Sequence, residues 1–405
     1  MLEVLSNRTY RHLFLAQLVA LLGTGLATVA LGLLAYDLAG GDAALVLGTV
    51  FTIKMIAYVV IGPLAGAFAG YFPRRALLVS LDLVRAATVA CLPFVTDVWQ
   101  VYVLIFVLQS ASAAFTPTFQ ATIPDVLPKE AHYTRALSLS RLAYDLDNII
   151  SPTLAVLLLL WIEYSTLFFG TALGFMLSAL LVVSVALPTS VPSERRGVYD
   201  RTTRGIRIYL GTPRLRGLLA LNFAAAAAGA MVLINSVVLV RANLQLDESA
   251  LALAMFAYGA GSMTAAFSLP RVLDVAGDRV VMFAGAVIAV CGLAGLAAYV
   301  AVSGLGWWPL LMAWAVIGFG YAAILTPSGR LLRRSAGSED RPALFAAQFA
   351  LSHACWLVTY PLSGWLLTRF GTVPTLLALA ALAGMGVLVA RKLWIKDSKP
   401  ESAPS

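Results

Sequence analysis

Charged residues are scarce in this chain. Of its 405 residues only 12% are Asp, Glu, Lys or Arg, whereas 60% are hydrophobic. A soluble protein of this length cannot hide so much apolar surface and still present a solvated exterior, and a disordered chain would be polar and rich in charge. Both classes are excluded, and the composition indicates a protein whose solvent is lipid.

Cysteine and histidine are also scarce, with three of each in the whole sequence. Every cysteine lies inside an apolar run, which excludes a disulfide framework, and the six residues show no metal-ligand spacing. No P-loop, HExxH or Ser/His/Asp arrangement is found, so we expect no enzyme, no cofactor and no direct coupling to ATP. The six residues are Cys91, Cys291, Cys355, His12, His132 and His353.

Long hydrophobic runs are abundant. A hydrocarbon core of about 30 Å needs about 20 apolar residues per helix, and twelve such segments occur. They lie at about 12–35, 45–69, 76–96, 99–121, 138–160, 166–187, 215–240, 249–270, 280–303, 308–327, 343–367 and 372–391. The sequence therefore predicts an all-α integral membrane protein with twelve transmembrane helices in two six-helix bundles.

The basic residues alternate in abundance between successive connections. Of the 28 Lys and Arg, 23 fall in connections on one side, Arg241 and Arg369 alone fall on the other, and three lie inside segments. Loops rich in Lys and Arg stay in the cytoplasm, so this asymmetry predicts that both termini are cytoplasmic. We expect the inner or plasma membrane of a bacterium, with lipid as the partner of the positive charge and no nucleic acid.

The longest connection, residues 188–214, follows the sixth segment and holds six arginines, and Arg216 lies just after it. We interpret it as a basic cytoplasmic linker against anionic lipid, although such a loop could also bind nucleic acid or an acidic partner. It divides the chain into an N-terminal bundle at 1–187 and a C-terminal bundle at 215–392, with a cytoplasmic tail at 393–405.

The two halves resemble each other. Pro117 and Pro327 each follow a Thr near the end of the fourth helix of their half, and Pro152 and Pro361 follow 35 and 34 residues later. Parallel six-helix repeats are one way in which transporters build a central site that alternates in access. Prolines also recur in unrelated transmembrane helices, so simple recurrence is the alternative.

Three stretches are distinctive: NRTYRHLFLAQLVALLGTGLATVALGLLAYDL at 7–38, GPLAGAFAGYFPRRALL at 62–78, and AFTPTFQATIPDVLP from 114 with the run that ends in ISP at 150–152. They resemble the major facilitator superfamily and its drug-, siderophore- and nickel-resistance exporter branch. The resemblance extends over essentially the whole chain. It implies a secondary transporter with a central cavity lined by the first, fourth, seventh and tenth helices.

The loop after the second helix departs from the family pattern, because it lacks the usual carboxylate and retains only the basic Arg74 and Arg75. We therefore do not transfer the family's charge latch to this chain. Gly62, Gly66 and Gly70 recur every fourth residue and form a ridge that permits close helix packing. Since the second and eleventh helices slide past each other in this family, the ridge is a candidate gating surface, with static packing as the alternative.

A charge near the centre of the bilayer costs about 2.5–3.5 kcal/mol, so each such residue is a functional candidate. Lys54 lies nine residues past Leu45, or about 13 Å into the membrane at 1.5 Å per residue. We expect it to have a carboxylate partner or to lie in a cavity; a buried ion pair that holds two helices together is the alternative.

The fifth helix offers carboxylates. Arg141 and Asp145 are spaced i, i+4 and share a face, whereas Asp147 faces elsewhere and is free to meet another helix. A buried carboxylate released by a cationic partner is suited to proton coupling, so Asp145 and Asp147 are the first candidates. His353 is a further candidate, because imidazole titrates near neutral pH, although a lone histidine often only packs.

Asp82 and Arg85 in the third helix are spaced i, i+3 and form another possible pair. We expect Asp82, Arg85 and Arg74 to form a structural network near the cytoplasmic end; substrate binding and gating are the alternatives.

Polar residues on the helices that the resemblance places around the cavity complete the candidate site. A mostly apolar cavity with scattered hydrogen-bonding groups suits amphipathic small molecules, although each of these residues could instead bond a neighbouring helix. The main candidates are Gln17, Thr24, Thr28, Gln109, Asn222, Asn235, Trp314 and Tyr321, and Ser112 and Thr116 also belong to this group.

From these features we expect a monomeric, proton-coupled transporter that exports a small organic molecule by alternating access, with the direction taken from the resemblance alone. The alternatives are an exporter of a divalent metal or siderophore, an uptake symporter and, in a different class, a membrane enzyme or a scaffold that transports nothing.

Overall fold

A computed structural model of the chain describes residues 2–39, 43–68, 72–188 and 198–394. These residues are helical, with short connections and no strand among them. Part of the predicted linker (189–197), most of the predicted tail (395–405) and Gly70 lie outside the described residues.

The first half of the chain contains six long helices after a short 3₁₀ turn, η1 (Leu2–Ser6). A capping box formed by Asp97 and Gln100 begins the fourth helix, because each side chain satisfies a backbone N–H of the first turn. A short 3₁₀ turn, η4 (Leu92–Phe94), follows the third helix. The helices are α1 (Arg8–Ala39), α2 (Ala43–Phe68), α3 (Arg74–Cys91), α4 (Val98–Val126), α5 (Glu130–Leu159) and α6 (Tyr164–Val183).

The second half repeats this plan. After an amphipathic helix, α7 (Val198–Gly211), come α8 (Pro213–Val237) with a π-helical extension η5 (Val238–Asn243), α9 (Glu248–Ser303) and α10 (Trp307–Leu325). They are followed by the short α11 (Ser328–Ser335), α12 (Arg341–Phe370) and α13 (Thr372–Leu393).

Helix α9 represents two membrane spans. Its 56 residues are interrupted at Gly277, whose φ of +73° and ψ of 162° are not helical. Glycine adopts a positive φ without the steric penalty of a Cβ, so the chain reverses here between the predicted segments 249–270 and 280–303.

Nine helices in the described part of the chain are long and apolar enough to cross a membrane, with residues 250–303 counted as one. Division of α9 at Gly277 adds a tenth. Helices α2 and α5, of 26 and 30 residues, complete the predicted set of twelve.

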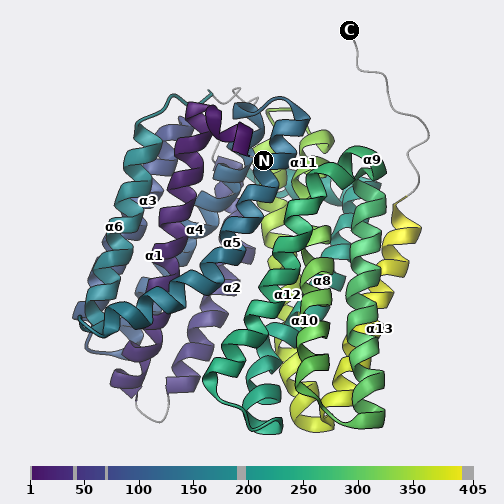
Figure 1. The fold of residues 1–405 in the computed structure, drawn as a ribbon. Coiled ribbons are helices and arrows are strands. Elements are labelled where there is room, and N and C mark those ends of the chain that lie inside the picture. The colour runs from purple at the N-terminus through teal and green to yellow at the C-terminus, as the bar shows by residue number, and fades with distance from the viewer. Residues whose placement is uncertain (1, 40–42, 69–71, 189–197, 395–405) are drawn as a thin grey trace.

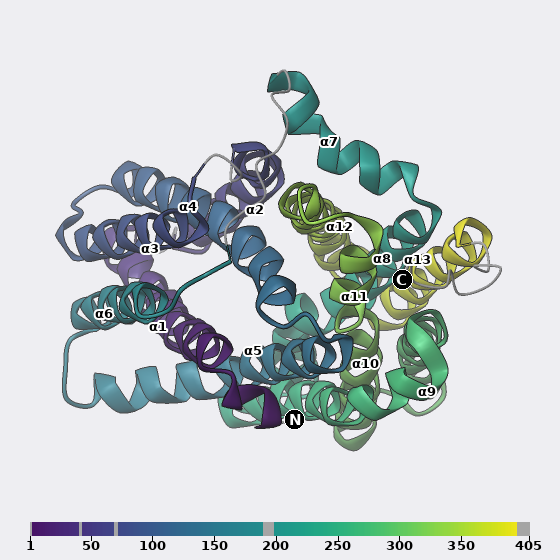
Figure 2. The same cartoon turned by 90° about the horizontal axis from the view of Figure 1, so that it is seen from above.

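The helices form two bundles, α1–α6 and α8–α13, which lie side by side when the molecule is seen from above (Figure 2). Each bundle has its own apolar core, with Leu34, Ile105 and Phe168 buried in the first. Leu293 and Trp314 are buried in the second.

Symmetry is visible in the way the bundles meet. Helix α2 packs against α12, and α5 packs against α9. The first contact joins the second and eleventh spans, and the second joins the fifth span to the eighth, since it involves Ser262 before the break. A shift of six spans exchanges these two contacts, as expected for a six-helix repeat.

One end of the molecule, here called the arginine-rich face, carries the start of α1, the end of α13 and α11 (Figure 1). Helix α7 packs there on α2 of one bundle and on α12 of the other. Arg204 Nη2 donates to Asp340 Oδ2 at 2.6 Å, and this hydrogen bond raises the pKa of Arg204, so the guanidinium stays charged. The predicted linker thus contains a docked helix.

Candidate functional site

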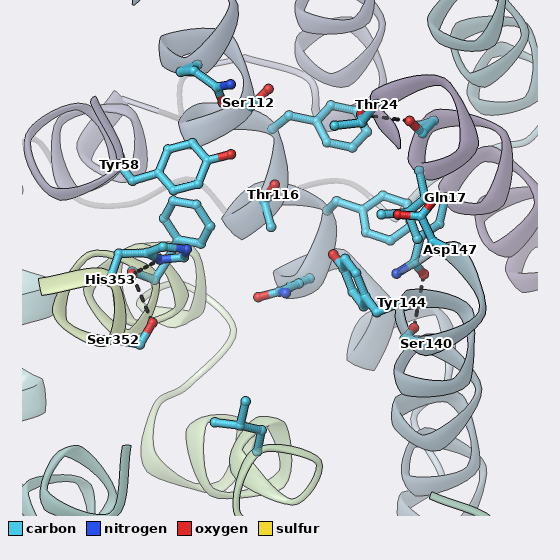
Figure 3. Close-up of a pocket in the computed structure, with 18 of the residues that line it drawn as sticks. Gln17, Thr24, Tyr58, Ser112, Thr116, Ser140, Tyr144, Asp147, Ser352 and His353 are labelled. Atoms are coloured by element: carbon cyan, nitrogen blue, oxygen red, sulfur yellow. Dashed lines mark hydrogen bonds between the residues drawn. The ribbon is translucent and has the colours of Figure 1, made fainter. Parts of the chain in front are cut away.

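A cavity of about 610 Å³ lies between the two bundles and is lined by residues of both (Figure 3). Ligand sites for small molecules usually enclose about 300–1,000 Å³, so this volume is suited to a molecule of drug-like size. The cavity is the candidate substrate site.

Most of the polar residues predicted for the cavity line it. Thr24 and Thr28 each donate a hydroxyl hydrogen bond of 2.8 Å to the carbonyl one turn earlier, and Gln17 Oε1 accepts one of 3.0 Å from Ser140. The predicted residues that line the cavity are Gln17, Thr24, Thr28, Gln109, Ser112, Thr116, Asn222 and Tyr321.

Two of the predicted cavity residues lie elsewhere. Asn235 is buried and donates to Ser363 Oγ at 2.9 Å, and Trp314 is buried and donates from Nε1 to Ser236 Oγ at 2.8 Å. Both residues lie on helices that were predicted to line the cavity, but their side chains point into the core of the second bundle. Their cavity assignment is therefore corrected to an internal hydrogen-bonding role.

Arg141 and Asp145 form the predicted pair, with Arg141 Nη2 at 2.6 Å from Asp145 Oδ1. Arg141 Nε also donates to Ser262 Oγ of α9 at 2.8 Å, and its guanidinium lies over the ring of Tyr321 at 4.8 Å from the centroid. Arg141 lines the cavity, whereas Asp145 lies behind it and is 1% exposed. The pair therefore links the two bundles at the depth of the cavity.

Asp147 lines the cavity, unlike Asp145. It accepts a hydrogen bond from Ser151, one turn later, and the structure shows no cation paired with it among the described residues. A Cβ added to Gly25 of α1 would lie 3.2 Å from Asp147 Oδ1, so α1 approaches this carboxylate closely. The expectation that Asp145 and Asp147 face different surroundings is confirmed. The side chains of Asn148 and Pro152, later in the same helix, lie outside the described residues.

Lys54 lies in the cavity wall, and its ammonium is 5.6 Å from the ring centroid of Tyr58. No ion pair of Lys54 is present in the described part of the chain, so of the two predicted surroundings, a carboxylate partner or a cavity, the cavity is the one observed. The reason is geometric: Asp145 is taken by Arg141, and Asp147 lies across the cavity from Tyr58 (Figure 3).

His353 packs against the same aromatic group. Its ring is 4.7 Å from that of Tyr58 and 4.3 Å from that of Phe349, and its Nδ1 is 2.7 Å from the Phe349 carbonyl oxygen. That hydrogen bond holds a proton on Nδ1 and leaves Nε2 as the other polar atom of the ring. His353 therefore lies in the cavity wall and shares its neighbour Tyr58 with Lys54.

Asp82 and Arg85 form a buried ion pair, as expected, and Ser178 donates to Asp82 at 2.8 Å. The guanidinium of Arg85 is held between two rings, 4.0 Å from the centroid of Phe115 and 4.4 Å from that of Phe175. Arg85 also lines the cavity. These contacts lie inside the first bundle, so they fix the wall of the cavity.

Arg74 does not join that network, contrary to expectation. It pairs instead with Asp125 at the end of α4, and Asp125 also pairs with Arg341 at the start of α12. Arg75 donates to the Val183 carbonyl. Asp125 thus supplies a carboxylate that the loop after the second helix lacks, and this carboxylate connects the two bundles.

A second set of ion pairs crosses the arginine-rich face. Arg330 lies 2.7 Å from Glu130 of α5 and 3.0 Å from Asp278 of α9, and Arg334 pairs with both carboxylates, at 2.8 Å to Asp278. These residues were not among the sequence candidates. Their signal was that the connections after the fourth and tenth segments, which the repeat makes equivalent, both carry charged residues. Together with Arg341 and Asp125 they form what is here called the arginine cluster.

The predicted glycine ridge is partly described. Gly62 lies against α12, because an added Cβ would be 3.4 Å from Phe349 and 3.8 Å from the Ala346 carbonyl. The surroundings of Gly66 fall outside the described set, as does Gly70 itself. The contact between the second and eleventh spans is therefore observed at Gly62, and its role in gating stays a prediction.

The sequence profile of the Major Facilitator Superfamily matches residues 13–238 and 218–405, which together cover most of the chain. The chain belongs to the Major Facilitator Superfamily. It is a multi-pass membrane protein, and the relatives it resembles are named as MFS-type transporters or as a macrolide efflux protein.

Curated relatives of this superfamily member are distant. The uncharacterized MFS-type transporter YfiS of Bacillus subtilis (strain 168) is 26% identical over 39% of this chain and 39% of that protein. Macrolide efflux protein A of Streptococcus pyogenes is 27% identical over 36% of this chain and 37% of that protein. The chain thus spans about two fifths of the length of these first relatives. The uncharacterized transporter YvqJ of B. subtilis is 24% identical, over 96% and 93%.

Solved structures of the superfamily share the fold. The human organic anion transporter MFSD10 (TETRAN) matches with a TM-score of 0.80 and 12% identity over 95% of this chain and 99% of that one. The transporter FucP in the outward conformation matches with a TM-score of 0.71 and 14% identity over 96% and 99%. At these identities the likeness shows the twelve-helix architecture alone.

Proposed function

We propose that this superfamily member is a proton-coupled antiporter that exports a small organic molecule across the inner membrane of a bacterium. In this proposal the arginine-rich face is cytoplasmic, and residues 1–187 rock against 215–392 around the cavity, with 188–214 as the connection. The export direction is supported by the macrolide efflux proteins among the relatives.

The proposal depends mainly on the surroundings of Asp147. This residue is a carboxylate in the wall of the cavity whose described partner is the hydroxyl of Ser151, whereas Asp145 is paired with Arg141. A carboxylate with no cation beside it can gain and lose a proton without the loss of an ion pair. Asp147 is therefore assigned as the proton carrier, and Asp145 as the structural partner of Arg141.

The arginine cluster supports alternating access. Its ion pairs join the two bundles at the arginine-rich face, and Arg333 also donates to the Pro128 carbonyl there. With this end held together, substrate would reach the cavity from the opposite face, and an exporter in this state would release its cargo and accept a proton.

Transport in proteoliposomes tests the proposal. The probes are a radiolabelled macrolide and a panel of fluorescent organic dyes, driven by an imposed pH gradient. Asp147→Asn is expected to abolish gradient-driven movement while substrate exchange at equal pH persists, because exchange requires no net proton transfer. Asp145→Asn on the same helix is expected instead to lower stability, because it leaves Arg141 without its partner, so thermal unfolding is measured alongside transport.

Two results would overturn the assignment. Unchanged gradient-driven transport and an unchanged pH profile in Asp147→Asn would remove Asp147 from the coupling. No movement of any probe in the wild-type protein would favour a scaffold. A nickel-type exporter has less support, since the described residues hold no group of three or more His, Cys, Asp or Glu that could bind a metal ion; Ni²⁺ in the panel tests it.

A further inference from the structure

The charges of the cavity wall do not balance locally. Its ionisable lining includes the cations Lys54, Arg85 and Arg141, but Asp147 is the single carboxylate among the described lining residues. Arg85 and Arg141 each have a carboxylate of their own behind the wall, Asp82 and Asp145. Lys54 is therefore the cation of the cavity that has no counter-charge beside it in the described structure.

A group of rings from α2 and α12 lies next to this lysine and contacts it through Tyr58. Tyr58 lies between the Lys54 ammonium and two α12 side chains, with its ring 4.8 Å from Phe349 and 4.7 Å from His353. Tyr58 and His353 face the cavity from one side, and Asp147, Gln17 and Tyr144 face it from the other (Figure 3). The ring of Tyr58 attracts the ammonium through its π face but does not neutralise it.

The aromatic wall continues away from Lys54. Trp356 lies in the cavity lining with its ring 6.0 Å from Tyr321 and 4.8 Å from Tyr360. Tyr321 in turn packs on Tyr258 at 5.9 Å. A planar apolar group could stack along this wall while a charged group at its end reached Lys54.

We propose that Lys54, Tyr58 and His353 form a subsite for the anionic group of the substrate, and that the cargo is an amphipathic organic anion such as an aryl carboxylate. The proposal rests on the proposed transport function and names the class of its substrate. The anion supplies the counter-charge that the wall lacks, and the Tyr58 hydroxyl and His353 are further polar groups beside it. The wall of Trp356 and Tyr321 receives the apolar body.

Binding to the purified full-length protein in detergent tests the subsite. The probes are two acid–amide pairs, 1-naphthylacetate with 1-naphthylacetamide and pyrenebutyrate with its amide, measured by calorimetry. The wild-type protein is expected to bind each acid at least tenfold more tightly than its amide. Lys54→Met, which keeps the length of the side chain, is expected to remove this preference, and Lys54→Arg to retain it.

Controls separate the subsite from general effects. Arg241→Met removes an exposed cation outside the cavity and is expected to leave the preference unchanged. Size-exclusion profiles of all variants report folding. Equal binding of acid and amide by the wild-type protein, or the same preference in Lys54→Met, would overturn the proposal.

Failure of this proposal is distinguishable from failure of the proposed function, because binding in detergent involves no gradient. Acid-selective binding that depends on Lys54, without pH-driven transport, would retain the subsite and reject proton coupling. Proton-driven transport with no preference for anions would retain the function and reject the subsite.

Discussion

Charged residues of the cavity wall that form an ion pair should affect the stability of the protein differently from those that form none. Arg141 and Asp145 are joined at 2.6 Å with the carboxylate 1% exposed, whereas Lys54 and Asp147 face the cavity with no ion pair in the described chain. A buried pair is strongly destabilised when one member is removed, because the other remains as an uncompensated charge. Stability measurements should therefore separate the two kinds of residue.

Arg141→Leu is expected to destabilise the protein by about 3–5 kcal/mol, the usual effect of removing one partner of a buried ion pair. The double variant Arg141→Leu/Asp145→Leu should regain most of this loss, because it removes the stranded carboxylate as well. Thermal unfolding in detergent checks both. Arg135→Leu is the control on the same helix: its partner Glu3 is exposed, so a change of about 0–1 kcal/mol is expected. Equal unfolding temperatures for Arg135→Leu and Arg141→Leu would contradict this.

Local spacing predicted some of these pairs and could not predict others. The i, i+4 and i, i+3 spacings gave Arg141–Asp145 and Asp82–Arg85, since residues three or four apart share a helix face. Arg74 and its partner Asp125 are 51 residues apart on different helices, and Asp125 pairs with Arg341 over 216 residues. Such partners depend on how helices are arranged, which spacing along one helix does not contain.

Helices α9 and α10 pack through glycine. A Cβ added to Gly318 would lie 2.0 Å from the Tyr258 carbonyl oxygen, and one added to Gly261 would lie 1.9 Å from the Ala315 carbonyl oxygen. Small residues let helix backbones approach closely in membranes, where apolar burial gives little preference for helix contact over lipid contact. This contact lies next to Ser262, which accepts the hydrogen bond of Arg141, so it also positions the cavity wall.

Gly318→Ala is expected to destabilise the protein by about 1–3 kcal/mol, because the added methyl group must push two backbones apart. Thermal unfolding in detergent measures the change. Gly295→Ala, in the same pair of helices, is the matched control, since nothing lies within 4 Å of its added Cβ. A stabilised or unchanged Gly318→Ala would show that α9 and α10 separate without cost.

The elements themselves were largely predictable, and the orientation of their side chains was less so. Hydrophobic length gave the twelve spans, and Gly277 separates the two that α9 merges. Asn235 and Trp314 lie on the predicted cavity helices but are turned toward Ser363 and Ser236. In a helix that is apolar on every side, the sequence hardly shows which face meets the cavity. The rotation of such a helix about its axis is set by its packing against other helices, so it could not be predicted from the sequence.

For the molecule as a whole, the ion pairs that join the two bundles at the arginine-rich face bear on the proposed alternating access. Asp125 and Glu130 of the first bundle contact Arg341, Arg330 and Arg334 of the second. Glu130 is 41% exposed in its side chain, so solvent screens its ion pairs, and partly exposed pairs contribute about 1 kcal/mol or less each. The pairs of Glu130 are weak enough for the two bundles to separate in the proposed alternating access, whereas Asp125 and Arg341, at 16% and 13% exposed, form the more protected contact.

Neutralisation of both carboxylates, Asp125→Asn with Glu130→Gln, is therefore expected to shift the molecule toward opening at this face by about tenfold, which corresponds to about 1.4 kcal/mol. A cysteine at Ser140, which contacts Gln17 in the cavity wall, reports the opening in a variant without the native cysteines. Its reaction with a membrane-impermeant thiol reagent should accelerate when the reagent is added at the arginine-rich face.

Glu3→Gln is the control, because it removes an acid that pairs with Arg135 within the first bundle, and it should leave the reaction rate unchanged. If both variants reacted at the wild-type rate, the arginine cluster would not be the element that keeps the cavity closed on this side, and the closure would have to come from the apolar contact between α2 and α12 at Gly62.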